Sequence, residues 1–254
     1  MSREGQRLIS AARFDRWEQA LANATAEALA RQQAYALAAV RGAGVQAAGN
    51  PPDPFDEASW DTSVDEVVRP VAQRIMTEVA TIALELLDAY EDLPAPAVDM
   101  APHVASLVSK VRGIGADVAA DLTVSLTEGS ILGESVLDLE ARVRGIFDST
   151  EARAHTIART SVVPAANGAH AEVAGVINDQ VVPLDKEWLA TSDDRTREWH
   201  AEADGQRVPY AEPFDVMGEA MMYPGDPAGS AANVVNCRCV VLYPEADTGT
   251  EQEA

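Results

Sequence analysis

Three side chains in the last third of the sequence are of the types that bind zinc: His200, Cys237 and Cys239. Zinc in proteins takes imidazole nitrogen and thiolate sulfur, usually as four ligands in a tetrahedron. The Cys-x-Cys spacing is tighter than the common Cys-x2-Cys, and the fourth ligand would be one of Asp194, Asp204 or His170. Alternatively, both cysteines are small buried residues and His200 is hydrogen-bonded inside the domain. A structural zinc and no cofactor at all both stay open.

The same residues define an enzymatic alternative, a metal-dependent hydrolase or toxin-like domain that uses His200, Asp204, Cys237 and Cys239. A Cys-His nucleophile pair needs a third orienting group and a turn that stabilises an oxyanion, and the sequence shows neither. Asp194 and His200 are six residues apart, which does not place them on one helical face. We therefore predict that the protein is not an enzyme and has no catalytic residues.

The formal net charge of −22 over 254 residues is unevenly distributed. Residues 1–48 are net positive, whereas 53–100 and 185–254 are the most acidic segments. Affinity for nucleic acid comes from clustered Lys and Arg, so broad nucleic-acid binding is not expected. An acidic surface favours solubility and docking to a basic partner. No stretch has the roughly 18 consecutive apolar residues of a membrane span, and the N-terminus lacks the apolar core of a signal peptide.

Residues 1–54 are predicted to form an amphipathic helical arm and a Pro/Gly linker. Apolar residues with a period near 3.6 predict a helix from about residue 6 to residue 40. Proline and glycine end it in the linker at residues 49–54. The helix either closes a bundle with other helices of the chain or docks into a groove of another protein. The linker favours docking, so Phe14, Trp17 and Leu21 are predicted to bind a partner.

Residues 55–149 are predicted to form a helical bundle. One apolar stripe runs from Val64 to Tyr90, with a kink or a helix start at Pro70, and a second covers 104–122 and is weakened at Gly113 and Gly115. A third helix is expected after Gly133 with Ser135 as its N-cap. A fourth would begin at Ser149 or Thr150 and run to about residue 176.

Residues 150–243 are predicted to form a small mixed domain with a short antiparallel sheet, which makes the protein α+β. Asn178-Asp179 between two apolar pairs indicates a turn, residues 187–191 and 239–243 suit strands, and residues 193–203 suit a helix. The acidic residues 244–254 are predicted to be a disordered tail.

Six short motifs occur in order in this region: Arg159-Thr160, Lys186-Glu187-Trp188, Asp194 to His200, Asp204-Gly205, Pro224-Gly225-Asp226-Pro227 and Asn236-Cys237-Arg238-Cys239. Over roughly residues 150–243 they resemble the C-terminal domain of the Mu F-like phage head morphogenesis family, which comprises minor capsid proteins of tailed phages. Many relatives have a cysteine where this chain has Arg197. A family site of three cysteines and one histidine would therefore be incomplete here.

The resemblance implies a virion protein of the phage head, made in the host cytoplasm and soluble, with no membrane association. Its expected partners are the portal protein and the major capsid or scaffold proteins, and it would accompany the DNA on ejection. The role in the phage head and the partners do not follow from composition or periodicity, which indicate only a soluble, acidic, helical and non-membrane protein, compatible with a non-enzymatic interaction module.

The motif residues are predicted mainly to organise the fold, through ion pairs, buried rings and turns. This set comprises Arg159, Thr160, Trp188, Asp194, Arg195, Thr196, His200, Asp204, Gly205, Asn236, Cys237, Arg238 and Cys239. A second apolar group in the loop 213–236 either packs under that loop or meets a partner. It includes Met221, Met222 and Tyr223, which we predict to be partner-binding.

Overall fold

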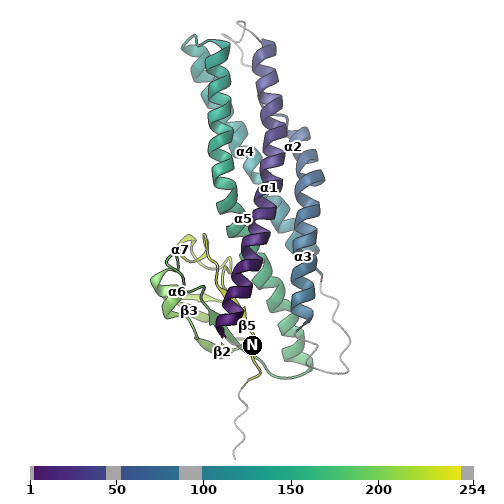
Figure 1. The fold of residues 1–254 in the computed structure, drawn as a ribbon, viewed down its shortest axis with the longest axis vertical. Helices are drawn as coiled ribbons and strands as arrows, with labels where there is room; N and C mark the ends of the chain where they lie inside the picture. Colours follow the sequence, from purple (N-terminus) through teal and green to yellow (C-terminus); the bar gives the residue numbers. More distant parts are fainter. Residues whose placement is uncertain (1–2, 44–52, 86–98, 247–254) are drawn as a thin grey trace, which may run out of the picture. The chain divides into compact units, whose positions relative to one another are not determined.

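The computed structural model describes residues 3–43, 53–85 and 99–246 and confirms an α+β protein (Figure 1). The helical elements are α1 (Arg3–Ala43), α2 (Glu57–Ser63), the π-helical segment η2 (Val64–Val68), α3 (Arg69–Leu84), α4 (Ala101–Ile131), α5 (Val136–Gln180), α6 (Glu198–Glu202) and α7 (Ala231–Val234). The strands are β1 (Asp185–Leu189), β2 (Arg207–Pro209), β3 (Phe214–Val216), β4 (Glu219–Met221) and β5 (Val240–Leu242). No helix of the described ranges is both long and apolar enough to cross a bilayer.

The chain divides into two compact units. The helical unit comprises Glu18–Arg74 and Val104–Ala158, and the mixed unit comprises Met1–Trp17, Ile75–His103 and Arg159–Ala254. The long helices α1 and α5 each contribute residues to both units. The boundaries expected from the sequence at residues 54, 149 and 243 stay predictions.

Within the helical unit, α1, α2, α4 and α5 run side by side (Figure 1). Ion pairs connect neighbouring helices: Arg31 with Glu66 at 2.9 Å, and Arg41 with Glu140 at 2.8 Å. Arg41 and Arg144 both donate to Glu140, and these hydrogen bonds lower the pKa of its carboxyl to about 2. Most of the described positions of the apolar stripes predicted from the sequence are buried, among them Val64, Val68, Leu107 and Val111.

The two glycines of α4 have different surroundings. Gly115 faces the indole of Trp60, so a β-carbon at this position would overlap the ring, whereas Gly113 has open space around it. The Trp60 Nε1–H donates to the carbonyl of Arg112 at 3.1 Å. Gly115 therefore makes room for the tryptophan of α2, and Gly113 has no comparable packing role.

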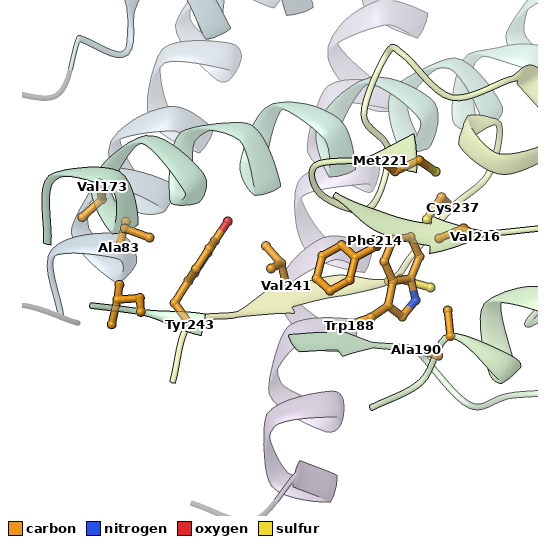
Figure 2. Packing of buried hydrophobic residues seen from close by; sticks show 14 of the residues in the cluster. Ala83, Val173, Trp188, Ala190, Phe214, Val216, Met221, Cys237, Val241 and Tyr243 are labelled. Carbon is orange, nitrogen blue, oxygen red and sulfur yellow. The ribbon is translucent and has the colours of Figure 1, made fainter. Parts of the chain in front are cut away.

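The mixed unit contains a three-stranded antiparallel sheet in the order β2-β1-β5 and the hairpin β3–β4. Trp188 of β1 is paired with Val241 of β5, and both are buried. The ring of Trp188 packs edge-on against that of Phe214, with centroids 5.4 Å apart (Figure 2). Val173 of α5 belongs to the same buried cluster. The sheet and α5 thus bury one shared core.

The helix boundaries differ from the sequence predictions at several points. The predicted third and fourth helices form one continuous α5, within which the Ser149 and Thr150 hydroxyls donate back to the carbonyl of Ile146. Ser135 does cap the N-terminus of α5, because its Oγ accepts from the Asp138 amide. No helix starts at Pro70, because Ser63, Val64 and Arg69 all have helical backbone angles and α3 continues directly from η2.

The end of α5 and the segment before α6 also differ from the sequence predictions. Asn178-Asp179 does not form a turn between strands, because α5 continues to Gln180 and the Asn178 Oδ1 accepts from the Leu184 amide. The helix expected over 193–203 is limited to α6, and turns precede it. The linker at 49–52, the stripe positions Leu86 and Tyr90, and tail residues 247–254 lie outside the described residues.

Candidate metal centre

His200, Cys237 and Cys239 form a buried cluster in the mixed unit. The His200 Nδ1 lies 3.5 Å from the Cys239 Sγ and 3.9 Å from the Cys237 Sγ. The three possible ligand atoms all lie within 4.8 Å of one another. Residues 37 and 39 positions apart in sequence thus converge on one point.

The loop before α6 fixes the position of His200. Asp193 accepts two hydrogen bonds of 2.6 Å from Arg238, one at each carboxylate oxygen. It also accepts from the Thr196 hydroxyl and from the Arg195 amide. The Arg238 guanidinium holds the pKa of Asp193 well below its usual range. This ion pair connects the loop that leads into the histidine-bearing helix α6 to the residue between the two cysteines.

Hydrogen bonds from α5 fix the backbone that carries the cysteines. Asn167 donates from Nδ2 to the carbonyls of Pro224 and Cys239, at 2.9 and 3.0 Å. The Asn236 amide donates to the Thr160 hydroxyl at 3.2 Å, and Asn236 has a positive φ of 59°. Thr160 and Asn236 belong to the motifs noted in the sequence. Their joint role is to set the turn that delivers Cys237 to the cluster.

Asn233 determines which nitrogen of His200 carries the proton. Its Oδ1 accepts from the Trp199 Nε1 at 2.7 Å and lies 3.3 Å from the His200 Nε2. Because an amide oxygen only accepts, Nε2 must be the protonated nitrogen of a neutral His200. The Asn233 Nδ2 donates to the carbonyl of Val216, which fixes the amide orientation. The lone pair on Nδ1 therefore faces the two sulfur atoms.

The two thiols interact with each other. The hydrogen bond from the Cys239 thiol lowers the pKa of Cys237, and the charges of Arg197 and Arg238 act in the same direction. The same hydrogen bond, together with burial, raises the pKa of Cys239.

None of the three candidate fourth ligands joins the cluster. Among described residues, the group of close His, Cys, Asp and Glu side chains consists of His200, Cys237 and Cys239. The Asp204 Oδ1 accepts from the Ala190 amide at 2.9 Å, and His170 packs edge-on against Tyr243. A small pocket borders the cluster instead, lined among others by Thr191, Thr196, Arg197 and Asn236. Two soft sulfurs and an imidazole suit zinc, with a fourth position toward this pocket.

The other motif residues lie around the cluster. Trp188 is in the core, and Gly205 has a positive φ of 82° in the turn that pairs with Trp188. Asp194 and Arg195 are exposed. Asp193, the residue before Asp194, makes the ion pair with Arg238. Arg197 donates to the carbonyl of Val235.

Sequence reasoning did not assign a role to Lys186, which is fully buried in β1. Its Nζ donates to the carbonyl of Met222 at 2.9 Å and lies 5.1 Å from the centre of the Phe214 ring. Burial lowers the pKa of Lys186 to about 8, and the charge of Asp226 partly opposes this. The signal in the sequence was a lysine at an inward position of an alternating strand.

The residues predicted to bind a partner have different exposures. Phe14, Trp17 and Leu21 are buried, and the Trp17 Nε1 donates to Glu78 of α3 at 2.8 Å. Met221 is also buried, Tyr223 is partly buried and Met222 is 39% exposed. Burial of the α1 residues is what packing against helices of the same chain produces. Partner binding by these side chains stays a prediction.

Comparison with known families bears on this region. Residues 117–242 match the family described as Phage Mu protein F like protein. This half of the chain is Mu F-like. The match confirms the resemblance seen in the motifs and begins earlier than expected, within α4. The Mu F-like segment contains the whole cluster and the α5 residues that position it.

Two curated proteins are similar to the chain. The NAD(+)–arginine ADP-ribosyltransferase EFV of Enterococcus faecalis is 30% identical over 129 residues, which cover 50% of this chain and 26% of that protein. The uncharacterized protein YqbB of Bacillus subtilis is 24% identical over 202 residues, which cover 76% of this chain and 64% of that protein. The chain thus spans less than two thirds of either relative. No solved structure matches it.

Proposed function

We propose that this protein acts in phage head morphogenesis as a minor capsid protein, binds the portal or the inner capsid during head assembly, and accompanies the DNA on ejection. The observation that carries the proposal is the match of residues 117–242 to the Phage Mu protein F like family. The net charge of −22 supports it, because an acidic protein inside a head is repelled by DNA and attracted to basic protein surfaces.

The contacts of the motif residues also support an assembly role. Hydrogen bonds join these residues to distant parts of the same domain: the Thr160 hydroxyl accepts from the Asn236 amide, and Arg238 donates to Asp193. Trp188 and Cys239 lie in its core. Side chains used in this way hold a shape, and an interaction module needs a rigid surface.

Two exposed methionines support placing this surface at the β3–β4 hairpin. Met217 at the tip of the β3–β4 hairpin is 59% exposed and has a positive φ of 57°, and Met222 follows β4 at 39% exposed. A non-glycine residue in that conformation is uncommon. Methionine adapts its shape to irregular partners. We assign the portal-binding contacts to Met217 and Met222.

Co-sedimentation with purified portal rings and with empty heads tests the proposal. The full chain should sediment with one of these particles, and the double variant Met217→Ser, Met222→Ser should lose most of that binding. The matched control replaces Leu132 and Leu137, which are 71% and 75% exposed in the helical unit, by serine and should bind normally. No binding to either particle would contradict the function, and loss only in the leucine variant would contradict the assigned surface.

We infer further that the chain is not an enzyme. A hydrolase built on His200, Cys237 and Cys239 would also need Asp204. The Asp204 Oδ1 instead accepts a hydrogen bond from the Ala190 amide. The relative named as an arginine ADP-ribosyltransferase shares only 26% of its length with this chain. Incubation with NAD+ and an arginine-containing acceptor should give no transfer. Transfer that disappears in a folded His200→Gln variant would reverse this conclusion.

A further inference from the structure

We propose that His200, Cys237 and Cys239 bind one zinc ion through the His200 Nδ1 and the two sulfurs, and that a water molecule from the bordering pocket completes the tetrahedron. This assignment goes beyond a role in head assembly and is independent of it. Three protein ligands and a water are also the ligand set of catalytic zinc sites, so bound zinc with an exchangeable water would support the metal-dependent hydrolase alternative and count against the inference that the chain is not an enzyme. Its basis is the geometry of the three ligand atoms and of the residues that orient them.

The distances between the ligand atoms match a tetrahedral zinc site. With Zn–S near 2.3 Å and Zn–N near 2.0–2.1 Å, tetrahedral angles place sulfur and nitrogen about 3.6 Å apart. The Nδ1 of His200 lies 3.5 Å from one sulfur and 3.9 Å from the other. The two sulfurs lie within 4.8 Å of each other, compared with about 3.8 Å in a tetrahedral site, so the three atoms reach a common centre with movements of up to about 1 Å.

The residues that orient the His200 ring are already in place. Zinc-binding histidines usually donate their other N–H to an acceptor that fixes the tautomer. Asn233 provides this acceptor, and Trp199 and Val216 hold the Asn233 amide in turn. Asn233 is itself completely buried.

The ligand charges suit a buried divalent cation. When zinc binds, the two S–H bonds break, their protons go to solvent, and two Zn–S bonds form. Two thiolates and a neutral imidazole then balance the charge of Zn2+, so no net charge is left in the core. A pocket lined by Thr191, Thr196 and Asn236 borders the same atoms and provides room for the water ligand.

Titration with cobalt(II) tests the site directly. Full-length protein is stripped of metal by a chelator in reducing buffer and titrated with cobalt(II), whose thiolate charge-transfer and visible bands report a tetrahedral sulfur site. We expect one equivalent to bind per chain, and zinc to displace it. His200→Gln, Cys237→Ser and Cys239→Ser should each weaken binding by about 100-fold or more, because loss of an outer-shell partner alone costs 10–100-fold.

The control is His155→Gln, which changes an exposed histidine of α5 and should bind cobalt like the wild type. Circular dichroism verifies that each variant is folded. The wild-type titration decides the matter even where a variant does not fold. Absence of sulfur–cobalt bands in the wild type, a Cys237–Cys239 disulfide that persists in reducing buffer, or unchanged affinity in folded cysteine variants would each overturn the site.

Discussion

Arg238 is the side chain on which the geometry around the cysteines depends most directly. Its side chain is only 10% exposed, that of Asp193 is 32% exposed, and the guanidinium reaches both oxygens of Asp193. Breaking a largely buried ion pair leaves one charge without a partner in a poor solvent for it. The pair therefore holds the loop before α6 against the backbone that carries Cys237 and Cys239.

Replacing Arg238 by alanine should lower the free energy of unfolding by about 2–4 kcal/mol. The matched control is Arg195→Ala, because Arg195 lies 3.7 Å from the same carboxylate but is 60% exposed. It should change stability by less than about 0.5 kcal/mol. Urea denaturation of both variants measures the difference. Equal losses in the free energy of unfolding would show that the Arg238 ion pair contributes no more stability than the exposed one.

Burial of His170 makes the free energy of unfolding of the mixed unit depend on pH. Burial lowers its pKa from 6.5 to about 4, and its Nε2 has no hydrogen-bond partner among the described residues. Between pH 6.5 and pH 4 the unfolded chain binds a proton that the folded chain does not, so stability falls as the pH falls.

The variant His170→Gln should remove this part of the pH dependence, which amounts to roughly 1–3 kcal/mol. Denaturation midpoints at pH 7 and pH 4.5 give the comparison, with His155→Gln as the control for an exposed histidine. If the wild type and His170→Gln lose the same stability on acidification, other groups are responsible.

At the scale of elements, Gly115 of α4 packs against the indole of Trp60 in α2. A β-carbon at Gly115 would push the indole away and weaken its hydrogen bond to the Arg112 carbonyl. Gly115→Ala should therefore destabilise the protein by about 1–3 kcal/mol. Gly113→Ala meets nothing within 4 Å and should stabilise it by about 0.5–1 kcal/mol through helix propensity. Thermal melts that shift in the same direction for both would contradict this packing.

The elements that the sequence predicted correctly are those fixed by local spacing. Apolar residues three or four apart gave α1, α3 and α4, because a helix face is a short-range pattern. The break expected at Ser149 failed because serine and threonine hydroxyls bond to carbonyls of the preceding turn as readily as they cap a new helix. The actual bonds to Ile146 therefore leave α5 uninterrupted.

The candidate site was predictable only in part. His200, Cys237 and Cys239 stood out by residue type, and the structure brings them together. Asn233 and Asn167 were missed, because they act on residues 33 and 72 positions away and asparagine has no distinctive spacing. Met221 and Met222 looked alike in sequence, but β4 turns the first inward and leaves the second exposed. Such differences depend on strand register, which no local pattern fixed here.

At the scale of the whole molecule, metal binding concerns one of the two units. The three proposed metal ligands lie together in the Mu F-like segment of the mixed unit, within one of the most acidic segments of the chain. Zinc therefore couples to the stability of that unit, because only its folded form brings the three ligands together.

Zinc at about 100 times its dissociation constant should stabilise the mixed unit by about 2.7 kcal/mol. Tryptophan fluorescence suits the measurement, because Trp17, Trp188 and Trp199 belong to the mixed unit and Trp60 belongs to the helical unit. The denaturation midpoint of the wild type should fall when a chelator replaces zinc, and that of Cys239→Ser should not move. A Trp60→Phe background removes the signal of the helical unit, so a zinc-dependent shift retained there assigns the linkage to the mixed unit. A shift of equal size in Cys239→Ser would mean that zinc acts elsewhere, since the serine hydroxyl is a poor substitute for the thiolate ligand.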